Sequence, residues 1–210
     1  MINKGIILAG GYGTRMSPLT KAINKQLLPI YDKPLIFYPL SILMLSGIRN
    51  ILIIVNKGQL DQFKKILPNG TNLGIKINYS EQQYPRGLPD AFLIGENFIG
   101  KSNIALILGD NFFYGQSLTK KLRECVKLNK GATVILHPVS NPSSYGVANI
   151  NATHHYEDAD EYEVDSTASG ATAITNFIYE ETLNDAKRNL TVIRPEYVNN
   201  VVNEFKKLLK

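Results

Sequence analysis

A glycine-rich segment near the start of the chain carries the strongest chemical signal in the sequence. Three glycines follow the short apolar run Gly5–Ala9: Gly10, Gly11 and Gly13. Glycine lets the backbone approach a ligand closely, and the N–H groups of such a loop can converge on phosphate oxygens. Arg15 and Lys25 come soon afterwards and could neutralise phosphate charge. We therefore interpret the segment as a phosphate-binding loop, in preference to a tight turn with no ligand.

Two well-known phosphate-binding motifs do not match this segment. No Gly-Lys-Ser/Thr triplet follows it, which excludes a Walker A loop. The third glycine of a dinucleotide fingerprint is missing, because Met16 stands there in one register. The expected chemistry therefore depends on the three glycines together with Arg15 and Lys25.

The apolar runs of the chain predict the sheet that would position this loop. Five runs rich in Ile, Val or Leu alternate with helical patterns: Gly5–Ala9, Ile51–Val55, Ile75–Tyr79, Ile104–Leu108 and Thr133–His137. Such runs are typical of strands buried on both faces of a mostly parallel sheet. Helices are expected between them, at Leu35–Leu45, Leu60–Leu67, Leu88–Phe98 and Leu118–Leu128. The alternation predicts an α/β, Rossmann-like, doubly wound sheet flanked by helices.

The whole chain of 210 residues, 44% of them hydrophobic, fits a single domain over residues 1–210. The pattern changes after Pro142. There we expect strands at Tyr145–Ile150 and Ala171–Tyr179, and helices at Glu181–Leu190 and Pro195–Leu209. The only cysteine, Cys125, lies on an apolar helical stripe, so we expect it in the core rather than as a nucleophile.

Charge is distributed unevenly along the chain. Residues 1–130 hold 17 Lys or Arg and 7 Asp or Glu, whereas residues 131–186 hold no Lys or Arg and nine Asp or Glu. The basic part could attract an anionic ligand. Nucleic acid is not expected as a partner, because the lysines are scattered and no recognition motif is present. No apolar stretch is long enough for a bilayer or a leader peptide, so we expect no membrane contact and a cytoplasmic location.

A carboxylate stands at the end of another expected strand. Asp110 follows Ile104–Leu108, at the carboxyl edge where open α/β sheets bind ligands. A carboxylate that bridges Mg²⁺ to phosphates is a usual arrangement for this ion. A helix cap or an Asx turn is the structural alternative for Asp110. A second metal candidate, His154 and His155 before several acids, is more simply interpreted as a solvated acidic loop.

Longer segments resemble the sugar-1-phosphate nucleotidylyltransferases. The resemblance covers about residues 3 to 150 and is carried by these stretches: Leu8-Ala9-Gly10-Gly11-x-Gly13-Thr14-Arg15, Pro18-Leu19-Thr20, Lys25-Gln26-Leu27-Leu28-Pro29-Ile30-Tyr31-Asp32-Lys33-Pro34, Gly87-Leu88, Leu108-Gly109-Asp110-Asn111 and Tyr145-Gly146-Val147. It implies the nucleotide-diphospho-sugar transferase type of fold. It also implies Mg²⁺-dependent transfer of a nucleotidyl group from dTTP or UTP to glucose 1-phosphate, with release of pyrophosphate, and it is compatible with a homo-oligomer.

The same resemblance implies a role for individual residues. It assigns the triphosphate to the loop and its flanks: Leu8, Gly10, Gly11, Gly13 and Thr14. It places Arg15 and Lys25 on the phosphates as the catalytic cations, and Asp110 on magnesium. It puts the base near Gln82 and Gly87, and the hexose near Tyr145 and Gly146.

The second half of the chain departs from the family's pattern. The family's Glu-Glu-Lys-Pro segment, whose lysine holds the sugar phosphate, has no counterpart, because residues 131–186 contain no lysine. The segment Trp-Leu-Asp-Thr-Gly, with a second metal aspartate, is absent too, and Arg86 and Pro89 replace the usual residues around Gly87. The sequence therefore predicts a nucleotidyltransferase with an intact nucleotide half. The alternative is a weak or inactive nucleotide-binding or regulatory paralogue, or a structural partner of a full-length homologue.

Overall fold

The computed structural model describes residues 1–127 and 191–193. Several predictions fall outside these residues: the strand Thr133–His137, the elements expected between residues 145 and 190, the helix Pro195–Leu209, the acidic loop with His154 and His155, and the sugar-site residues Tyr145 and Gly146. They stay predictions.

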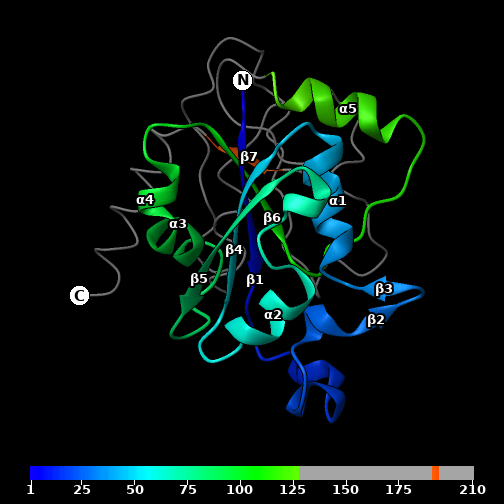
Figure 1. The fold of residues 1–210 in the computed structure, drawn as a ribbon, viewed down its shortest axis with the longest axis vertical. Coiled ribbons are helices and arrows are strands. Elements are labelled where there is room, and N and C mark those ends of the chain that lie inside the picture. The colour runs from blue at the N-terminus through cyan, green and yellow to red at the C-terminus, as the bar shows by residue number, and fades with distance from the viewer. Residues whose placement is uncertain (128–190, 194–210) are drawn as a thin grey trace, which may run out of the picture.

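A five-stranded sheet forms the centre of the described part (Figure 1). Its strand order is β5-β4-β1-β6-β7. The strands are β1 (Lys4–Ala9), β4 (Asn50–Asn56), β5 (Lys76–Gln82), β6 (Ile104–Leu108) and β7 (Thr191–Ile193). The first four in this order run parallel, and β7 is antiparallel to β6. The prediction of a mostly parallel α/β sheet is confirmed.

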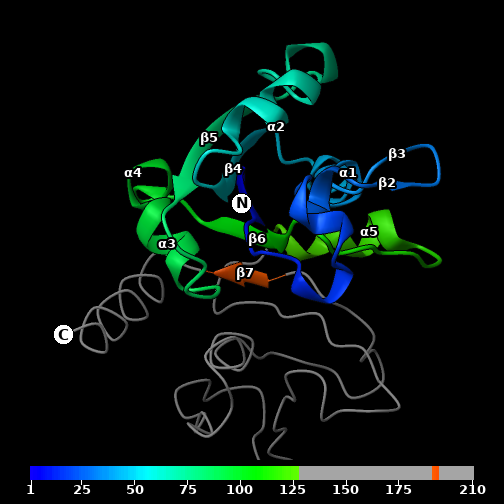
Figure 2. The same cartoon turned by 90° about the horizontal axis from the view of Figure 1, so that it is seen from below.

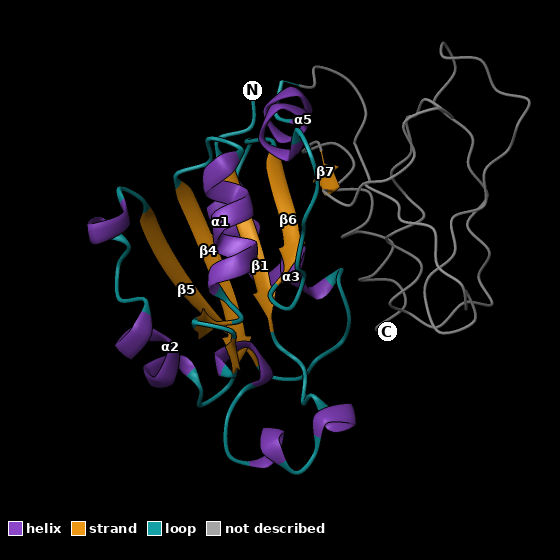
Figure 3. Cartoon of the chain, turned by 90° about the vertical axis from the view of Figure 1, so that its right-hand side faces the viewer, coloured by secondary structure: helices purple, strands orange, loops and turns teal. Residues whose placement is uncertain are grey.

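The direction in which strands are added changes at β1. The chain places β4 and then β5 on one side of β1, and β6 on the other side. Such a switch point leaves room for a ligand outside the carboxyl ends of the strands. Figure 3 shows these strand ends together at the lower edge of the sheet, where the chain leaves β1.

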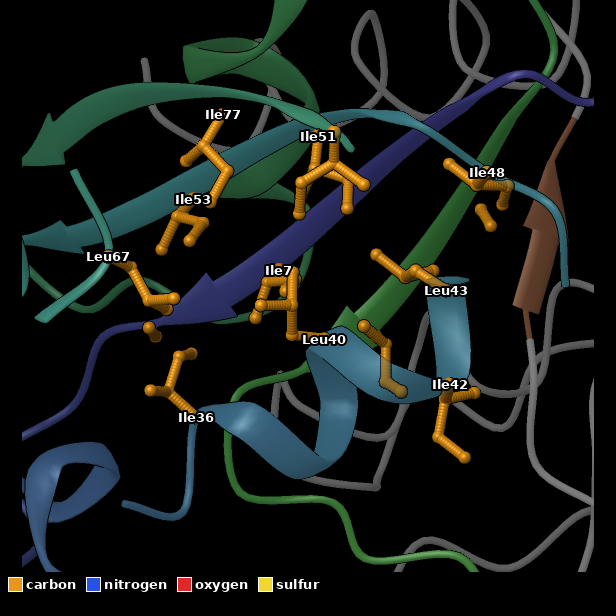
Figure 4. Close-up of a cluster of buried hydrophobic side chains, with 14 of the residues drawn as sticks. Ile7, Ile36, Leu40, Ile42, Leu43, Ile48, Ile51, Ile53, Leu67 and Ile77 are labelled. Carbon is orange, nitrogen blue, oxygen red and sulfur yellow. The ribbon is translucent and has the colours of Figure 1, made fainter. Parts of the chain in front are cut away.

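Side chains alternate between the two faces of the sheet, and each face has its own core. On one face Ile7 and Ile53 belong to one core with residues of α1 (Phe37–Leu45), and Figure 4 shows Ile7 beside Leu40 of that helix. The helices α2 (Leu60–Ile66) and α5 (Leu118–Cys125) also bury side chains in this core. On the other face Ile6 and Leu52 pack with α3 (Asp90–Ile94) and α4 (Glu96–Ile99). Figure 2 shows α1 and α3 on opposite sides of the sheet.

The prediction of one continuous helix over Leu88–Phe98 is wrong, because the chain forms two short helices there, α3 and α4. The break lies at Gly95, whose N–H bonds back to the carbonyl of Ala91. A Cβ at Gly95 would lie 2.8 Å from that carbonyl oxygen. The break therefore needs glycine, and it lets the chain turn while it stays packed on the sheet.

Two features of the described fold have no counterpart in the sequence analysis. The strand β7 was not predicted, and a short hairpin of β2 (Pro29–Ile30) and β3 (Lys33–Pro34) projects beside α1 (Figure 1). Cys125 packs against the core beside the buried Leu122 and Val126, which confirms the apolar stripe of α5. No helix within the described residues has the length and apolar character needed to cross a membrane.

Candidate functional site

The candidate site lies where the parallel strands end. The glycine loop follows β1, Asn56 and Gln82 are the last residues of β4 and β5, and Asp110 comes two residues after β6. In the register of the sheet Ala9 pairs with Val55, and Asn56 pairs with Gln82. The fold thus brings the predicted glycines, Gln82 and Asp110 to one edge, together with Asn56, which the sequence analysis had not singled out.

The loop after β1 uses glycine conformations that other residues rarely adopt. Gly11 has φ 95° and Gly13 has φ 60°, both in the left-handed region. Gly13 leads into a 3-10 helix, Thr14–Met16, which leaves the side chains of Thr14 and Arg15 exposed. The carbonyl of Gly13 accepts a hydrogen bond from Oγ1 of Thr20 at 2.8 Å, which fixes the end of the loop.

Gly10 makes room for a side chain of the site. A Cβ on Gly10 would lie 1.5 Å from Nε2 of Gln82, which is far inside van der Waals contact. The side chain of Gln82 is 3% exposed, and its amide lies directly against the backbone of Gly10. In this structure the first glycine of the motif thus brings the predicted base-binding residue against the predicted phosphate loop.

Asn56 holds Gly11 through both of its backbone groups. The N–H of Gly11 donates to Oδ1 of Asn56 at 3.0 Å, and Nδ2 of Asn56 donates to the carbonyl of Gly11 at 2.9 Å. One N–H of the expected phosphate cradle is therefore already bonded to the protein. The sequence signal that could have found Asn56 is its place: it is a polar residue directly after the buried run Ile51–Val55.

A second polar segment, which contains Asn24 and Gln26, forms hydrogen bonds with the backbone where the loop begins. The side chain of Asn24 accepts a hydrogen bond from the N–H of Gln26 at 2.8 Å and donates to the carbonyl of Ala9 at 3.3 Å. Nε2 of Gln26 donates to the carbonyl of Gly10 at 3.4 Å. Within the described residues Oε1 of Gln26 is buried and has no hydrogen-bond partner. A buried acceptor without a partner lowers the stability of the folded state unless a ligand or water donates a hydrogen bond to it.

The predicted cation and the predicted metal ligand form an ion pair. Nζ of Lys25 contacts Oδ2 of Asp110, and the two side chains are 25% and 31% exposed. Because neither is fully buried, both can exchange this contact for a ligand. No cluster of three or more potential metal ligands occurs among the residues that the structure describes. Mg²⁺ commonly binds through one or two carboxylates with phosphate oxygens and water, so Asp110 fits this ion when phosphate is present.

A buried carboxylate anchors the turn around Gly87. Asp90 is 1% exposed, and its Oδ1 accepts a hydrogen bond from the guanidinium of Arg86 at 2.8 Å. A buried carboxylate needs such a charged partner. Gly87 lies inside this i,i+4 pair with φ 97°. Arg86, a departure from the family's usual sequence, thus has a structural role beside the predicted base site.

These features define a class of protein: a doubly wound α/β protein with a glycine loop, a lysine and a carboxylate at the switch point of its sheet. The family model described as "Nucleotidyl transferase" matches residues 4–197. The chain belongs to the nucleotidyl transferase family.

Individual relatives carry more specific names. The chain is 53% identical over 148 residues to a glucose-1-phosphate thymidylyltransferase of Neisseria meningitidis, which covers 70% of this chain and 51% of that protein. It is 42% identical over 204 residues to the enzyme of the same name from Mycolicibacterium smegmatis, covering 96% of this chain and 70% of that protein. It also resembles a solved UDP-glucose pyrophosphorylase complexed with UDP-glucose, with a TM-score of 0.69 and 27% identity over 96% of this chain and 79% of that one. The chain thus spans about half the length of the Neisseria relative.

Proposed function

We propose that this chain transfers a nucleotidyl group from dTTP, or from UTP, to glucose 1-phosphate. The names of its relatives support this reaction. The structural observation that carries the proposal is the meeting of Lys25 and Asp110 beside the glycine loop, at the switch point of the sheet.

In the proposed reaction a phosphate oxygen of glucose 1-phosphate attacks the α-phosphorus of the triphosphate. The new phosphorus–oxygen bond forms as the bond to the bridging oxygen of the β-phosphate breaks, and pyrophosphate leaves with that electron pair. No covalent intermediate with the enzyme is required. The protein contributes position and charge: the loop holds the triphosphate, and Arg15 and Lys25 stabilise the negative charge that shifts to the leaving group.

Magnesium fits this scheme at Asp110. When bound there, Mg²⁺ would neutralise phosphate charge next to the reacting phosphorus. In the structure the carboxylate of Asp110 forms an ion pair with Lys25. We therefore infer that Lys25 turns from Asp110 to a phosphate as nucleotide and metal enter, because a carboxylate oxygen that binds Mg²⁺ no longer needs the lysine as its partner.

A second candidate function rests on the composition of residues 131–186. That segment has no Lys or Arg and nine Asp or Glu. A sugar phosphate needs cationic partners. A chain that binds the nucleotide and turns over weakly or not at all would be a regulatory paralogue or a partner of a full-length homologue.

Calorimetric titration of dTTP in the presence of Mg²⁺ tests the proposed site. The Lys25→Met variant should bind about tenfold or more weakly, because one charge-assisted contact to phosphate is lost. Lys76→Met is the matched control, since Lys76 is exposed at the start of β5, at the opposite end of the strand from Gln82. Equal affinities in the wild type and the Lys25→Met variant would contradict the assignment of Lys25.

A further inference from the structure

A chain of hydrogen bonds connects the glycine loop to Gln82, the residue that is predicted to bind the base. Oδ1 of Asn56 accepts two hydrogen bonds, one from the N–H of Gly11 at 3.0 Å and one from Nε2 of Gln82 at 2.9 Å. Asn56 is 8% exposed and Gln82 is 3% exposed, so water competes little for these contacts. Gly11 lies in the loop after β1, and Asn56 and Gln82 are the last residues of β4 and β5, the two strands next to it in the sheet.

The backbone decides which way the amide of Asn56 faces. A backbone N–H can only donate and a carbonyl can only accept. Because the side chain of Asn56 bonds both groups of Gly11, its oxygen must face the N–H and its nitrogen must face the carbonyl. The reversed amide would set two donors together at one contact and two acceptors at the other.

The orientation of the Asn56 amide in turn fixes the orientation of the Gln82 amide. Oδ1 of Asn56 is an acceptor, so only the NH₂ end of the Gln82 amide can meet it. If the Gln82 amide turned over, two oxygens would face each other at a buried site, which is costly. The N–H donor end of Gln82 is therefore held toward β4, and its Oε1 is left to accept a hydrogen bond from a ligand.

We propose that Asn56 determines base specificity by fixing the direction in which the Gln82 amide faces the base. This inference rests on the proposed function, since it assumes that Gln82 meets a pyrimidine. In uracil and thymine N3 carries a hydrogen and the 4-position is a carbonyl oxygen. In cytosine N3 is an acceptor and the 4-position carries an NH₂ group.

The fixed amide suits only one of these edges. Oε1 of Gln82 can accept from the N3–H of uracil or thymine, while the second hydrogen on Nε2 donates to a neighbouring carbonyl oxygen. With the base held in the same pose by its phosphates, cytosine would set N3 against Oε1, acceptor against acceptor. Cytosine needs the Gln82 amide turned over, and Asn56 opposes that turn.

The test compares dUTP with dCTP, which differ only at the edge of the base that Gln82 would read. Affinities are measured by calorimetry with Mg²⁺ on the full chain. The wild type should favour dUTP by about tenfold or more, as expected for a lost hydrogen bond and an unpaired buried acceptor. In Asn56→Leu the amide of Gln82 can turn, so the ratio of the two affinities should fall to about a third of its wild-type value or less.

Two more variants separate specificity from a merely structural role. Asn56→Asp keeps the acceptor for Gln82, so both nucleotides should bind more weakly by repulsion while their ratio stays as in the wild type. Asn56→Ser has a hydroxyl that can donate or accept and so imposes no polarity; it should lower the ratio as Asn56→Leu does, and it replaces that variant if leucine prevents folding. In Gln82→Leu, adding Asn56→Leu should change the ratio no further.

The outcomes distinguish a failure of the proposed function from a failure of the proposed role of Asn56. If the wild type binds neither nucleotide, the proposed function fails. If the wild type binds dUTP and dCTP equally well, or if the ratio survives in Asn56→Leu and Asn56→Ser, the role of Asn56 is overturned while nucleotide binding stands. If Asn56→Asp loses the ratio together with Asn56→Leu, Asn56 acts on the loop as a whole and the proposal is also overturned.

Discussion

Arg15 stands exposed just after the glycine loop, and no ion pair connects it to another side chain within residues 1–127. We predict that Arg15→Ala weakens binding of dTTP by about 1.5–3 kcal/mol, the range for a hydrogen bond to a charged group. Calorimetry with Mg²⁺ measures this change, and Lys76→Ala serves as the charge-matched control. Because Arg15 packs against no core, the unfolding curve of the variant should match that of the wild type. Unchanged affinity would count against the loop as a phosphate site.

Asp110 provides a second prediction at the scale of one residue. Asp110→Asn keeps the shape of the side chain and removes the charge that a hard cation needs. We expect nucleotide binding in this variant to become independent of Mg²⁺, as measured by titration of dTTP with Mg²⁺ and with EDTA. α5 begins after Ser117, so Asp110 caps no helix among the described residues. A purely structural role of Asp110 in the turn after β6 would instead give a loss of stability with the Mg²⁺ dependence intact.

The residues of the candidate site were predictable to different degrees. The glycines, Lys25 and Asp110 were predicted from motifs or from a strand end, whereas Gln82 was assigned from the family resemblance alone. The role of Asn56 depends on the register between β4 and β1, which sets it level with the loop. The sequence shows that Asn56 follows an apolar run, but its contact with Gly11 depends on that register, which is a tertiary property. The same holds for Asn24, whose contact with the carbonyl of Ala9 joins residues that are 15 positions apart.

At the scale of elements, β5 contains Tyr79, a titratable residue whose pKa depends on its burial. Burial raises the pKa of Tyr79 to about 12, and its hydroxyl donates to the carbonyl of Leu67. A pKa that is higher in the folded state means that the folded chain retains its proton between about pH 10 and 12, where the unfolded chain loses it. The resulting stability is fully present below about pH 10 and is lost as pH rises toward 12.

We therefore predict a fall in the free energy of unfolding above about pH 10. Urea unfolding at several pH values measures it in the wild type and in Tyr79→Phe. The difference in free energy between the two proteins should shrink as pH rises through this window, since phenylalanine has no proton to lose. A difference that stays constant from pH 8 to pH 12 would show that the hydroxyl is not protected by burial.

The elements themselves follow from the sequence where a long apolar pattern exists. The runs after Lys4 and after Asn50 became β1 and β4 with nearly the expected bounds, because both faces of these strands are buried. The strand predicted over Ile75–Tyr79 was too short, since the last part of β5, up to Gln82, is polar and gives no apolar signal. β7 has three residues, Thr191–Ile193, and pairs with a strand some 90 positions away, so only the fold reveals it.

At the scale of the whole molecule, the distribution of charge separates two binding steps. Arg15 and Lys25, which are proposed to bind the triphosphate, lie in the basic first part of the chain, whereas residues 131–186 contain no Lys or Arg for a sugar phosphate. We predict an affinity for dTTP close to that of the thymidylyltransferase relatives, with much weaker binding of glucose 1-phosphate and weak turnover. Replacing His154–Ser169 by the Glu-Glu-Lys-Pro loop should raise turnover if the missing lysine is the defect. Strong wild-type turnover at ordinary concentrations of glucose 1-phosphate would contradict this prediction and show that another cation binds the sugar phosphate; Lys187, Arg188 and Arg194 are the candidates.

The reaction itself is the most direct test of nucleotidyl transfer at the switch point of this sheet. The measurement is pyrophosphate release from dTTP, UTP, CTP and ATP, each with Mg²⁺ and with or without glucose 1-phosphate. We predict release with dTTP or UTP that requires glucose 1-phosphate, is slow, yields the nucleoside diphosphate glucose, and disappears in Arg15→Ala. Release from no triphosphate, or release that does not depend on the sugar phosphate, would contradict this function.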